Sequence, residues 1–125
     1  MQYEEFIESA SARTGRPAEI AESLTHATLR VLAERLTGGE ARDLASQLPK
    51  ELQPDLIPPT QEAQPLEAQD FVRRVAEQAR VDEGEARKAV AAVLTTTREA
   101  VSHGEWEDVA SQMGRELDVL MAGAQ

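Results

Sequence analysis

The sequence predicts an all-α protein: two tandem three-helix repeats packed about a pseudo-twofold axis as a helical bundle. Its 125 residues are 41% hydrophobic but only 3% aromatic, and the apolar residues are mostly Ala, Leu and Val, which suit closely packed helices. No run of β-branched and aromatic residues alternates with polar ones, as strands do. The segment GGEARDLASQLPKEL (38–52) recurs as HGEWEDVASQMGREL (103–117), 65 residues later, which indicates an internal repeat.

The repeat covers nearly the whole chain and divides it into two units. The same offset aligns Phe6 with Phe71, so the first unit covers residues 1–57 and the second covers residues 67–125. Residues 58–66 form a proline-containing linker between them. Because a three-helix unit of this size is marginal alone, we expect the two units to pack together as one compact domain. Two separate units on a semi-rigid linker are the alternative.

The first helix of each unit is amphipathic. Its apolar residues have the i, i+3, i+4, i+7 spacing of one helix face, and they are Tyr3, Phe6, Ile7 and Ala10, then Ala68, Phe71, Val72 and Val75. Gly15 breaks the first of these helices, and Pro17 suits the first turn of the next one. In the second unit, Asp82 and Glu85 have the spacing of a capping box.

The second helix of each unit is long and the third is short. The second carries Ile20, Leu24, Val31, Leu32 and Leu36, then Ala86, Ala89, Val90, Val93, Leu94 and Val101. Gly38 suits a left-handed C-cap that would end the first long helix. The third carries Ala41, Leu44, Ala45 and Leu48, then Trp106, Val109, Ala110 and Met113. Pro49 ends or kinks the first of these, and each unit finishes in a short apolar segment: Leu52, Leu56 and Ile57, then Leu117, Leu120 and Met121.

Composition argues against several classes of partner. The formal net charge of −10 disfavours nucleic-acid binding, because an acidic surface repels phosphate backbones and no run of Lys and Arg compensates. The chain has no cysteine, which fits a reducing compartment. Its first residues are acidic where a signal peptide would be basic, and the longest apolar run, Ala89–Leu94, is too short to cross a bilayer. We therefore expect a cytoplasmic protein that binds neither nucleic acid nor membranes.

Catalytic and metal-binding patterns are missing from the sequence. The only histidines, His26 and His103, occupy non-equivalent positions of the two units, and no nucleophile–base–acid arrangement accompanies them. Glu105, Glu107 and Asp108 follow His103 and could hold a divalent ion weakly, but acidic residues are also favoured at a helix N-terminus by the macrodipole. We expect no enzyme activity, no metal and no cofactor.

Two pairs of acidic residues lie at matched positions of the repeat, Glu40 with Glu105 and Asp43 with Asp108. A pseudo-twofold axis could bring the members of each pair together, and close carboxylates shift one another's pKa. The alternative is that each glutamate only occupies the first turn of its third helix. We favour the alternative, because the sequence does not show where the axis passes.

Trp106 stands where the first unit has Ala41. Tryptophan is enriched at interaction hot spots, so Trp106, together with Met113 on the same helix face, is our candidate partner-binding site. The other interpretation is that Trp106 is a large core residue in one unit where the other unit uses a small one.

The motif LTGGEARDLASQLPKEL (36–52), its second copy and the opening YEEFIESASARTG (3–15) resemble the bacterial family called domain of unknown function 2267. The resemblance covers nearly the whole chain, but the second copy has Met113-Gly114 where the first has Leu48-Pro49. It implies a small helical protein and supplies no catalytic residue, substrate or cofactor.

The leading functional hypothesis is a non-enzymatic cytoplasmic helical scaffold that binds a protein partner or itself. It rests on a complete helical plan without a chemical constellation, and on one isolated tryptophan. The alternative is a small-molecule or metabolite binder that uses a cavity between the repeats.

Overall fold

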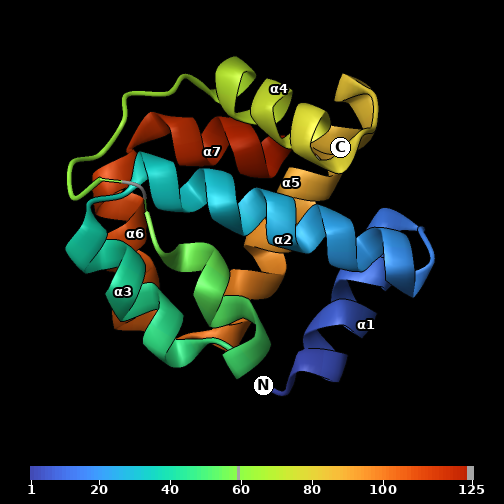
Figure 1. Cartoon of the computed structure of the whole chain (residues 1–125), viewed down its shortest axis with the longest axis horizontal. Helices are drawn as coiled ribbons and strands as arrows, with labels where there is room; N and C mark the ends of the chain where they lie inside the picture. The colour runs from blue at the N-terminus through green and yellow to red at the C-terminus, as the bar shows by residue number, and fades with distance from the viewer. Residues whose placement is uncertain (59, 124–125) are drawn as a thin grey trace.

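The computed structural model describes residues 1–58 and 60–123, which form seven α-helices and one 3-10 helix (Figure 1). In chain order these are α1 (Tyr3–Thr14), α2 (Ala18–Arg35), α3 (Gly38–Gln47), η1 (Lys50–Leu56), α4 (Ala68–Ala79), α5 (Glu83–Ala100), α6 (His103–Met113) and α7 (Arg115–Ala122). No strand occurs in this described part of the chain, so the all-α prediction is confirmed. Residue 59 of the predicted linker and residues 124–125 of the predicted second unit lie outside the described residues.

The helix boundaries recur at the spacing read from the sequence. Helices α1 and α4 begin 65 residues apart, and so do α2 and α5. The turns that follow α1 and α4 also match, because Gly15 and Arg80 both have left-handed backbones, with φ of 70° and 59°. Half of the capping box predicted at the start of α5 is present: the Asp82 side chain accepts from the Glu85 backbone N–H at 2.7 Å, whereas the Glu85 carboxylate pairs with Arg16.

The turn between α2 and α3 differs from the prediction. Gly38 is not a left-handed C-cap but the first residue of α3. Helix α2 ends at Arg35, and Leu36 leaves it with an extended backbone because its side chain is drawn into the core. Thr37 then acts as N-cap of α3, so the turn needs no left-handed residue.

The two halves end differently. The first ends in the 3-10 helix η1, which contains Pro54, a residue that lacks the N–H required by a regular α-helix. The second ends in the α-helix α7, and Gly114 joins it to α6 with a positive φ of 61°. Within the apolar segment predicted to end the first unit, Leu52 and Leu56 are buried, whereas Ile57 is exposed just beyond η1.

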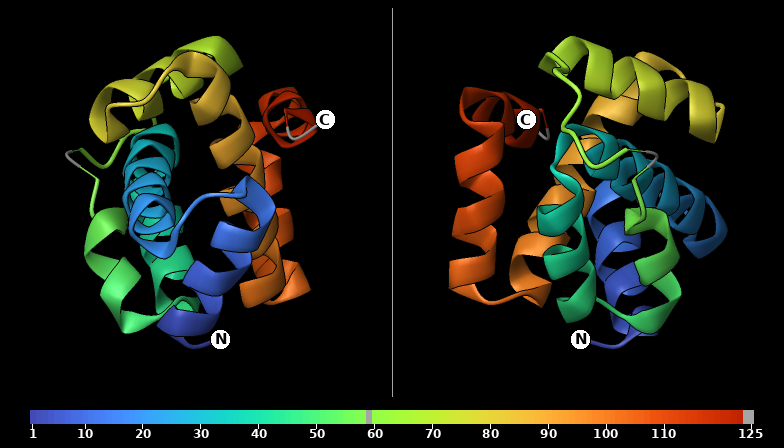
Figure 2. Two further views of the ribbon diagram at one scale, coloured as in Figure 1. Left: turned by 90° about the vertical axis from the view of Figure 1, so that its right-hand side faces the viewer. Right: turned by 60° about the vertical axis from the view of Figure 1, so that its left-hand side comes forward.

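The halves share one hydrophobic core. Helix α1 packs on α5 as well as on α2, and α4 packs on α2 as well as on α5. Helix α2 crosses the middle of the molecule in Figure 1, and Figure 2 shows α6 beside α3 at one side of the bundle. The largest fully buried side chains come from both halves and include Phe6, Phe71, Leu32 and Leu94. Buried side chains of both halves therefore belong to the same hydrophobic cluster.

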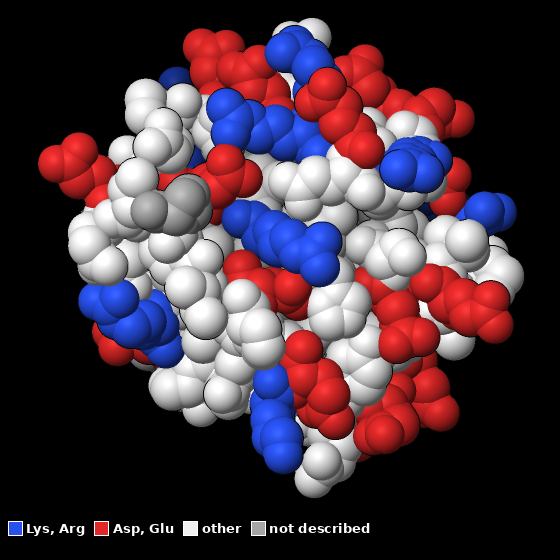
Figure 3. Space-filling view, in the orientation of Figure 1, with Lys and Arg blue, Asp and Glu red and all other residues white. Residues whose placement is uncertain are grey.

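The surface carries charges of both signs. Acidic and basic side chains are interspersed on the face drawn in Figure 3, in keeping with a charge excess spread along the whole chain. Within residues 1–58 and 60–123, no helix combines the length and the apolar character that spanning a membrane requires.

A candidate carboxylate site between α3 and α6

Helices α3 and α6 begin with the same local structure. The Thr37 hydroxyl accepts a hydrogen bond from the Glu40 backbone N–H at 3.3 Å, and the Ser102 hydroxyl accepts one from the Glu105 N–H at 3.1 Å. Each glutamate is therefore the third residue of its helix. In the usual capping box, a glutamate at this position turns back and accepts a hydrogen bond from the N-cap backbone N–H.

In this protein, glutamines from the opposite helix occupy those N-cap donors. The Thr37 backbone N–H donates to Gln112 Oε1 at 3.0 Å, and the Ser102 N–H donates to Gln47 Oε1 at 2.7 Å. Gln112 Nε2 also donates to the Thr37 hydroxyl at 3.0 Å. Each helix thus caps the other, and neither glutamate is needed to complete its own capping box.

The released carboxylates are buried near each other. Glu40 and Glu105 are each only 8% exposed, and the Oε2 atom of each has no hydrogen-bond partner among the described residues. The exposed side chain of Asp43 lies beside them, and one carboxylate oxygen from each of the three residues lies within 4.8 Å of the other two. Packing of α3 against α6 therefore assembles three carboxylates at the edge of the core.

This concentration of negative charge affects the protonation of Glu105. Burial raises the pKa of Glu105 to about 8, and the neighbouring carboxyl group of Glu40 acts in the same direction. The charges of Asp43 and Asp108 raise the pKa as well. A buried carboxylate without a cationic neighbour is costly, so the group needs either a proton or a bound cation.

The donor set suits one class of ion. Carboxylate oxygens without sulfur or imidazole favour hard cations such as Ca²⁺, Mg²⁺ and Mn²⁺. Two oxygens on opposite sides of a Ca²⁺ ion are about 4.6–5.2 Å apart, given its usual bond lengths. The 4.8 Å limit on the three oxygens is therefore compatible with one ion between them.

In the sequence, Glu105 groups with Glu107 and Asp108, but the structure places it with Glu40 and Asp43. Glu105 turns inward to Glu40, whereas Glu107 pairs with the exposed His103, whose Nε2 lies 2.5 Å from Glu107 Oε1. His103 is the first residue of α6. Asp108 lies close enough to influence the pKa of Glu105 but is not one of the three grouped carboxylates.

Trp106 and Met113, our candidate partner-binding residues, are both in the core. Trp106 is 8% exposed and Met113 is 2% exposed, and both belong to the main hydrophobic cluster. Neither side chain offers a surface to a partner while α6 stays packed, so the site must be corrected to the alternative of a large core residue. The apolar face of α6 is satisfied within the chain.

The family follows from comparison with known proteins. Residues 3–120 match the model of a family described as an uncharacterized conserved protein, DUF2267. The chain belongs to the DUF2267 family. No curated protein matches it. The matched range includes α3 and α6, so the carboxylate site lies inside the DUF2267 region.

A second polar cluster of the DUF2267 chain was missed from the sequence. The Tyr3 hydroxyl donates to Glu22 Oε2 at 2.6 Å and lies 3.1 Å from His26 Nε2. His26 Nδ1 hydrogen-bonds to the carboxylate of Asp55, which also accepts from Arg30 Nε at 3.1 Å. These residues come from α1, α2 and η1, and no short motif connects them.

This cluster superficially resembles a catalytic triad. Burial, together with the hydrogen bond and charge of Glu22, raises the pKa of Tyr3 well above its ordinary value. The hydroxyl is thus held as a neutral donor to Glu22, which is the opposite of an activated nucleophile. The geometry gives no support to nucleophilic catalysis by Tyr3.

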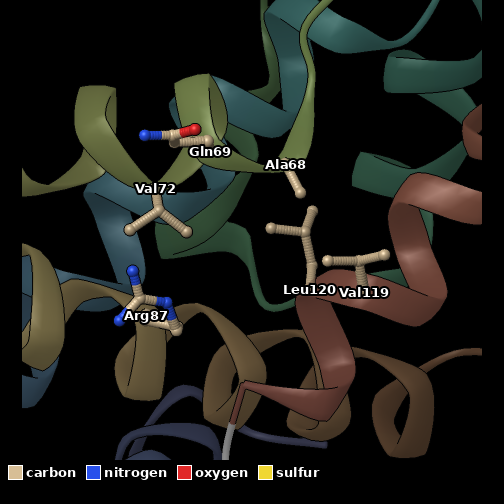
Figure 4. A pocket seen from close by; sticks show the side chains of 6 residues that line it. All are labelled: Ala68, Gln69, Val72, Arg87, Val119 and Leu120. Atoms are coloured by element: carbon tan, nitrogen blue, oxygen red, sulfur yellow. The ribbon is translucent and has the colours of Figure 1, made fainter.

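A separate surface hollow of about 240 Å³ lies between α4 and α7 in the DUF2267 chain (Figure 4). Its lining residues are Ala68, Gln69, Val72, Arg87, Val119 and Leu120. All of them come from the second half of the chain, so this hollow is not the cavity between repeats that the metabolite-binding hypothesis requires.

Proposed function

We propose that this DUF2267 protein is a cation-binding helical protein, in which Glu40, Asp43 and Glu105 hold one divalent ion between α3 and α6. The observation that carries the proposal is the pair of buried Oε2 atoms on Glu40 and Glu105, which have no hydrogen-bond donor among the described residues. Buried polar atoms are almost always satisfied, and an ion is a direct way to satisfy two carboxylates at once.

We propose further that the chain is a tandem repeat packed about a pseudo-twofold axis that passes between α3 and α6. The recurring helix boundaries support this arrangement. So does the reciprocal capping, because Gln47 and Gln112 occupy matched positions of the repeat and each one bonds to the N-cap of the other unit's helix. An axis at this place would make Glu40 and Glu105 symmetry mates and explain why both face the same point.

A divalent cation suits the site better than a monovalent one. Two buried carboxylates and a third at the rim carry up to three negative charges, and Asp108 adds to the local field. The exposed side chain of Asp43 marks the side from which an ion and its remaining water ligands would enter. A bound ion would tie the two halves together at the end of the bundle, which suits a scaffold more than an enzyme.

The test is a titration of the full chain, freed of metal with a chelator, at pH 8. Calorimetry and thermal unfolding are followed with CaCl₂, MgCl₂ and MnCl₂ in separate experiments. We expect saturable binding of at least one ion, and an ion at about 100 times its Kd should add about 2.7 kcal/mol to the free energy of unfolding. Fluorescence of the single tryptophan, Trp106, gives a second readout beside Glu105.

The matched variants are Glu40→Gln and Glu105→Gln, with Glu107→Gln as a control on the exposed face of α6. Either of the first two should abolish saturable binding, and the control should retain it. If folded wild-type protein shows no saturable heat, unfolding shift or fluorescence change with any of the three ions at millimolar concentration, the carboxylates share a proton and the proposal is wrong.

The wider hypothesis of a non-enzymatic cytoplasmic scaffold with a protein partner stays a prediction. Its proposed contact residues must be sought outside Trp106 and Met113, because both are buried. Metabolite binding between the repeats also stays a prediction.

A further inference from the structure

The hydrogen-bond partners of His26 place an oxygen atom beside each of its ring nitrogens. Glu22 can only accept as a carboxylate, so the Tyr3 hydroxyl places its proton toward Glu22, 2.6 Å away. The Tyr3 oxygen is then left as an acceptor for His26 Nε2 at 3.1 Å. This contact therefore requires a proton on Nε2.

The other ring nitrogen also faces an acceptor. Asp55 receives Arg30 Nε on one oxygen and His26 Nδ1 on the other, and its side chain is only 7% exposed. A carboxylate held in this way has no proton to donate to Nδ1. While the Tyr3 hydroxyl donates to Glu22, both ring nitrogens of His26 thus face acceptor oxygens, an arrangement complementary to an imidazolium.

An imidazolium at His26 can lose its proton from either ring nitrogen, and the two outcomes differ. If Nδ1 lost its proton, its lone pair would face the buried Asp55 carboxylate, which is repulsive. If Nε2 lost its proton, the Tyr3 hydroxyl could rotate from Glu22 to His26 and donate to the ring. The second route keeps the Asp55 bond and costs only the bond to Glu22.

We infer that His26 is a proton switch that controls Glu22: charged His26 directs the Tyr3 hydroxyl to Glu22, and neutral His26 takes that hydroxyl and releases the Glu22 carboxylate. Glu22 and His26 both line a surface hollow of about 370 Å³ between α2 and α4. The His26 side chain is 26% exposed, so it exchanges protons with solvent through this hollow.

The titratable and charged groups around the switch come from three helical elements. Helix α1 contributes Tyr3, and η1 contributes Asp55 and, at longer range, Glu51. Helix α2 contributes Glu22, Arg30 and Glu19, and α4 contributes only the neutral Gln78 to the shared hollow. Release of Glu22 would therefore add a free carboxylate to a hollow that already contains Glu19, so the hollow would attract cationic groups more strongly when His26 is neutral.

The experiment is a pH titration by nuclear magnetic resonance of the full chain carrying His103→Gln, which leaves His26 as the only histidine. Nitrogen shifts of the imidazole report its tautomer, and the carboxyl carbon of Glu22 reports its hydrogen bonding. We expect both ring nitrogens to be protonated at low pH and only Nδ1 to be protonated at high pH. The Glu22 carboxyl signal should shift with the same midpoint as His26.

Tyr3→Phe in the same background is the matched variant, because it removes the hydroxyl and keeps the ring. It should keep the fold by circular dichroism and lose most of the Glu22 shift that follows His26. The inference is overturned if neutral His26 carries its proton on Nε2, or if the Glu22 signal follows His26 equally in the Tyr3→Phe variant.

Discussion

The side chain of Gln47 caps the helix that begins after Ser102, with Oε1 accepting the Ser102 backbone N–H at 2.7 Å across 55 residues of sequence. Gln112 does the same for Thr37 across 75 residues. These bonds hold α3 and α6 together and also determine where Glu40 and Glu105 point. Structural capping and the candidate ion site are therefore one arrangement.

The capping bonds of Gln47 and Gln112 predict that truncating either side chain destabilises the protein. Gln112→Ala removes two hydrogen bonds to Thr37 and should reduce the free energy of unfolding by about 1–2 kcal/mol, whereas Gln47→Ala removes one and should cost about 1 kcal/mol. Urea unfolding followed by circular dichroism measures both. Ser111→Ala, at an exposed neighbouring position of α6, is the control and should not destabilise. Equal stability of all three variants and the wild type would contradict the capping role.

The raised pKa of Glu105 predicts that the stability of the metal-free protein depends on pH. Its folded-state pKa of about 8 exceeds the ordinary carboxyl value, so the folded state binds more protons than the unfolded state between roughly pH 4.5 and 8. The stabilising contribution of the protonated group is full below this window and is lost as the pH rises through it. The slope from one group cannot exceed about 1.4 kcal/mol per pH unit.

Glu105→Gln imitates the protonated acid and should remove this dependence. We expect the variant to exceed the wild type in stability by about 1–2 kcal/mol at pH 9, with solvent beside Asp43 reducing the full effect. Urea unfolding at pH 5, 7 and 9 in the presence of a chelator measures the difference, with Glu107→Gln as control. Parallel pH profiles for Glu105→Gln and the wild type would show that Glu105 is ionised throughout.

Neighbouring glycines provide a matched pair at the start of α3. A Cβ on Gly38 would lie 2.2 Å from Gln61 Oε1 and 3.2 Å from Gln61 Cα, and that Oε1 accepts a hydrogen bond from Arg42. A Cβ on Gly39 would meet nothing within 4 Å. Gly39→Ala should be neutral or stabilise by up to about 1 kcal/mol, and Gly38→Ala should be about 1–2 kcal/mol less stable than Gly39→Ala. Thermal unfolding compares them, and equal melting temperatures would mean that the linker does not hold this turn.

Arg80 has the left-handed backbone that Gly15 adopts in the first half, with φ of 59°. A residue with a Cβ pays roughly 1 kcal/mol in this conformation. Arg80→Gly should therefore raise the free energy of unfolding by up to about 1 kcal/mol, and Gly15→Ala should lower it by a similar amount. Thermal unfolding tests both, and a loss of stability in Arg80→Gly would show that the arginine side chain makes a larger contribution than the backbone strain.

Much of the fold could be predicted because helix formation depends on residues within a few positions. The apolar spacing around Phe6 and Phe71 and the capping pair Asp82–Glu85 each express a contact inside one or two helical turns. Gly38 was misassigned for the same reason. A glycine after a long helix suits a C-cap, but burial of Leu36 ended that helix earlier and made Gly38 the start of the next one.

The candidate sites could not be predicted from local sequence patterns alone. The matched acids Glu40 and Glu105 were visible in the sequence, and so was the possibility that they meet. That they do meet depends on which faces of α3 and α6 pack together and on Gln47 and Gln112 taking the N-cap donors. The contacts of His26 with Tyr3 and Asp55 span 23 and 29 residues, and nothing at those separations marks them in the sequence.

By itself, the sequence determined that this chain is helical, that one segment recurs 65 residues later and where some helices begin or end, because backbone hydrogen bonding and amphipathic spacing are local properties. Only the tertiary structure decided that Trp106 is buried, that His26 lies between Tyr3 and Asp55, and that Glu40 and Glu105 each bury one oxygen that meets no donor within residues 1–58 and 60–123. Those relationships depend on the relative placement of whole helices, which the shared core sets.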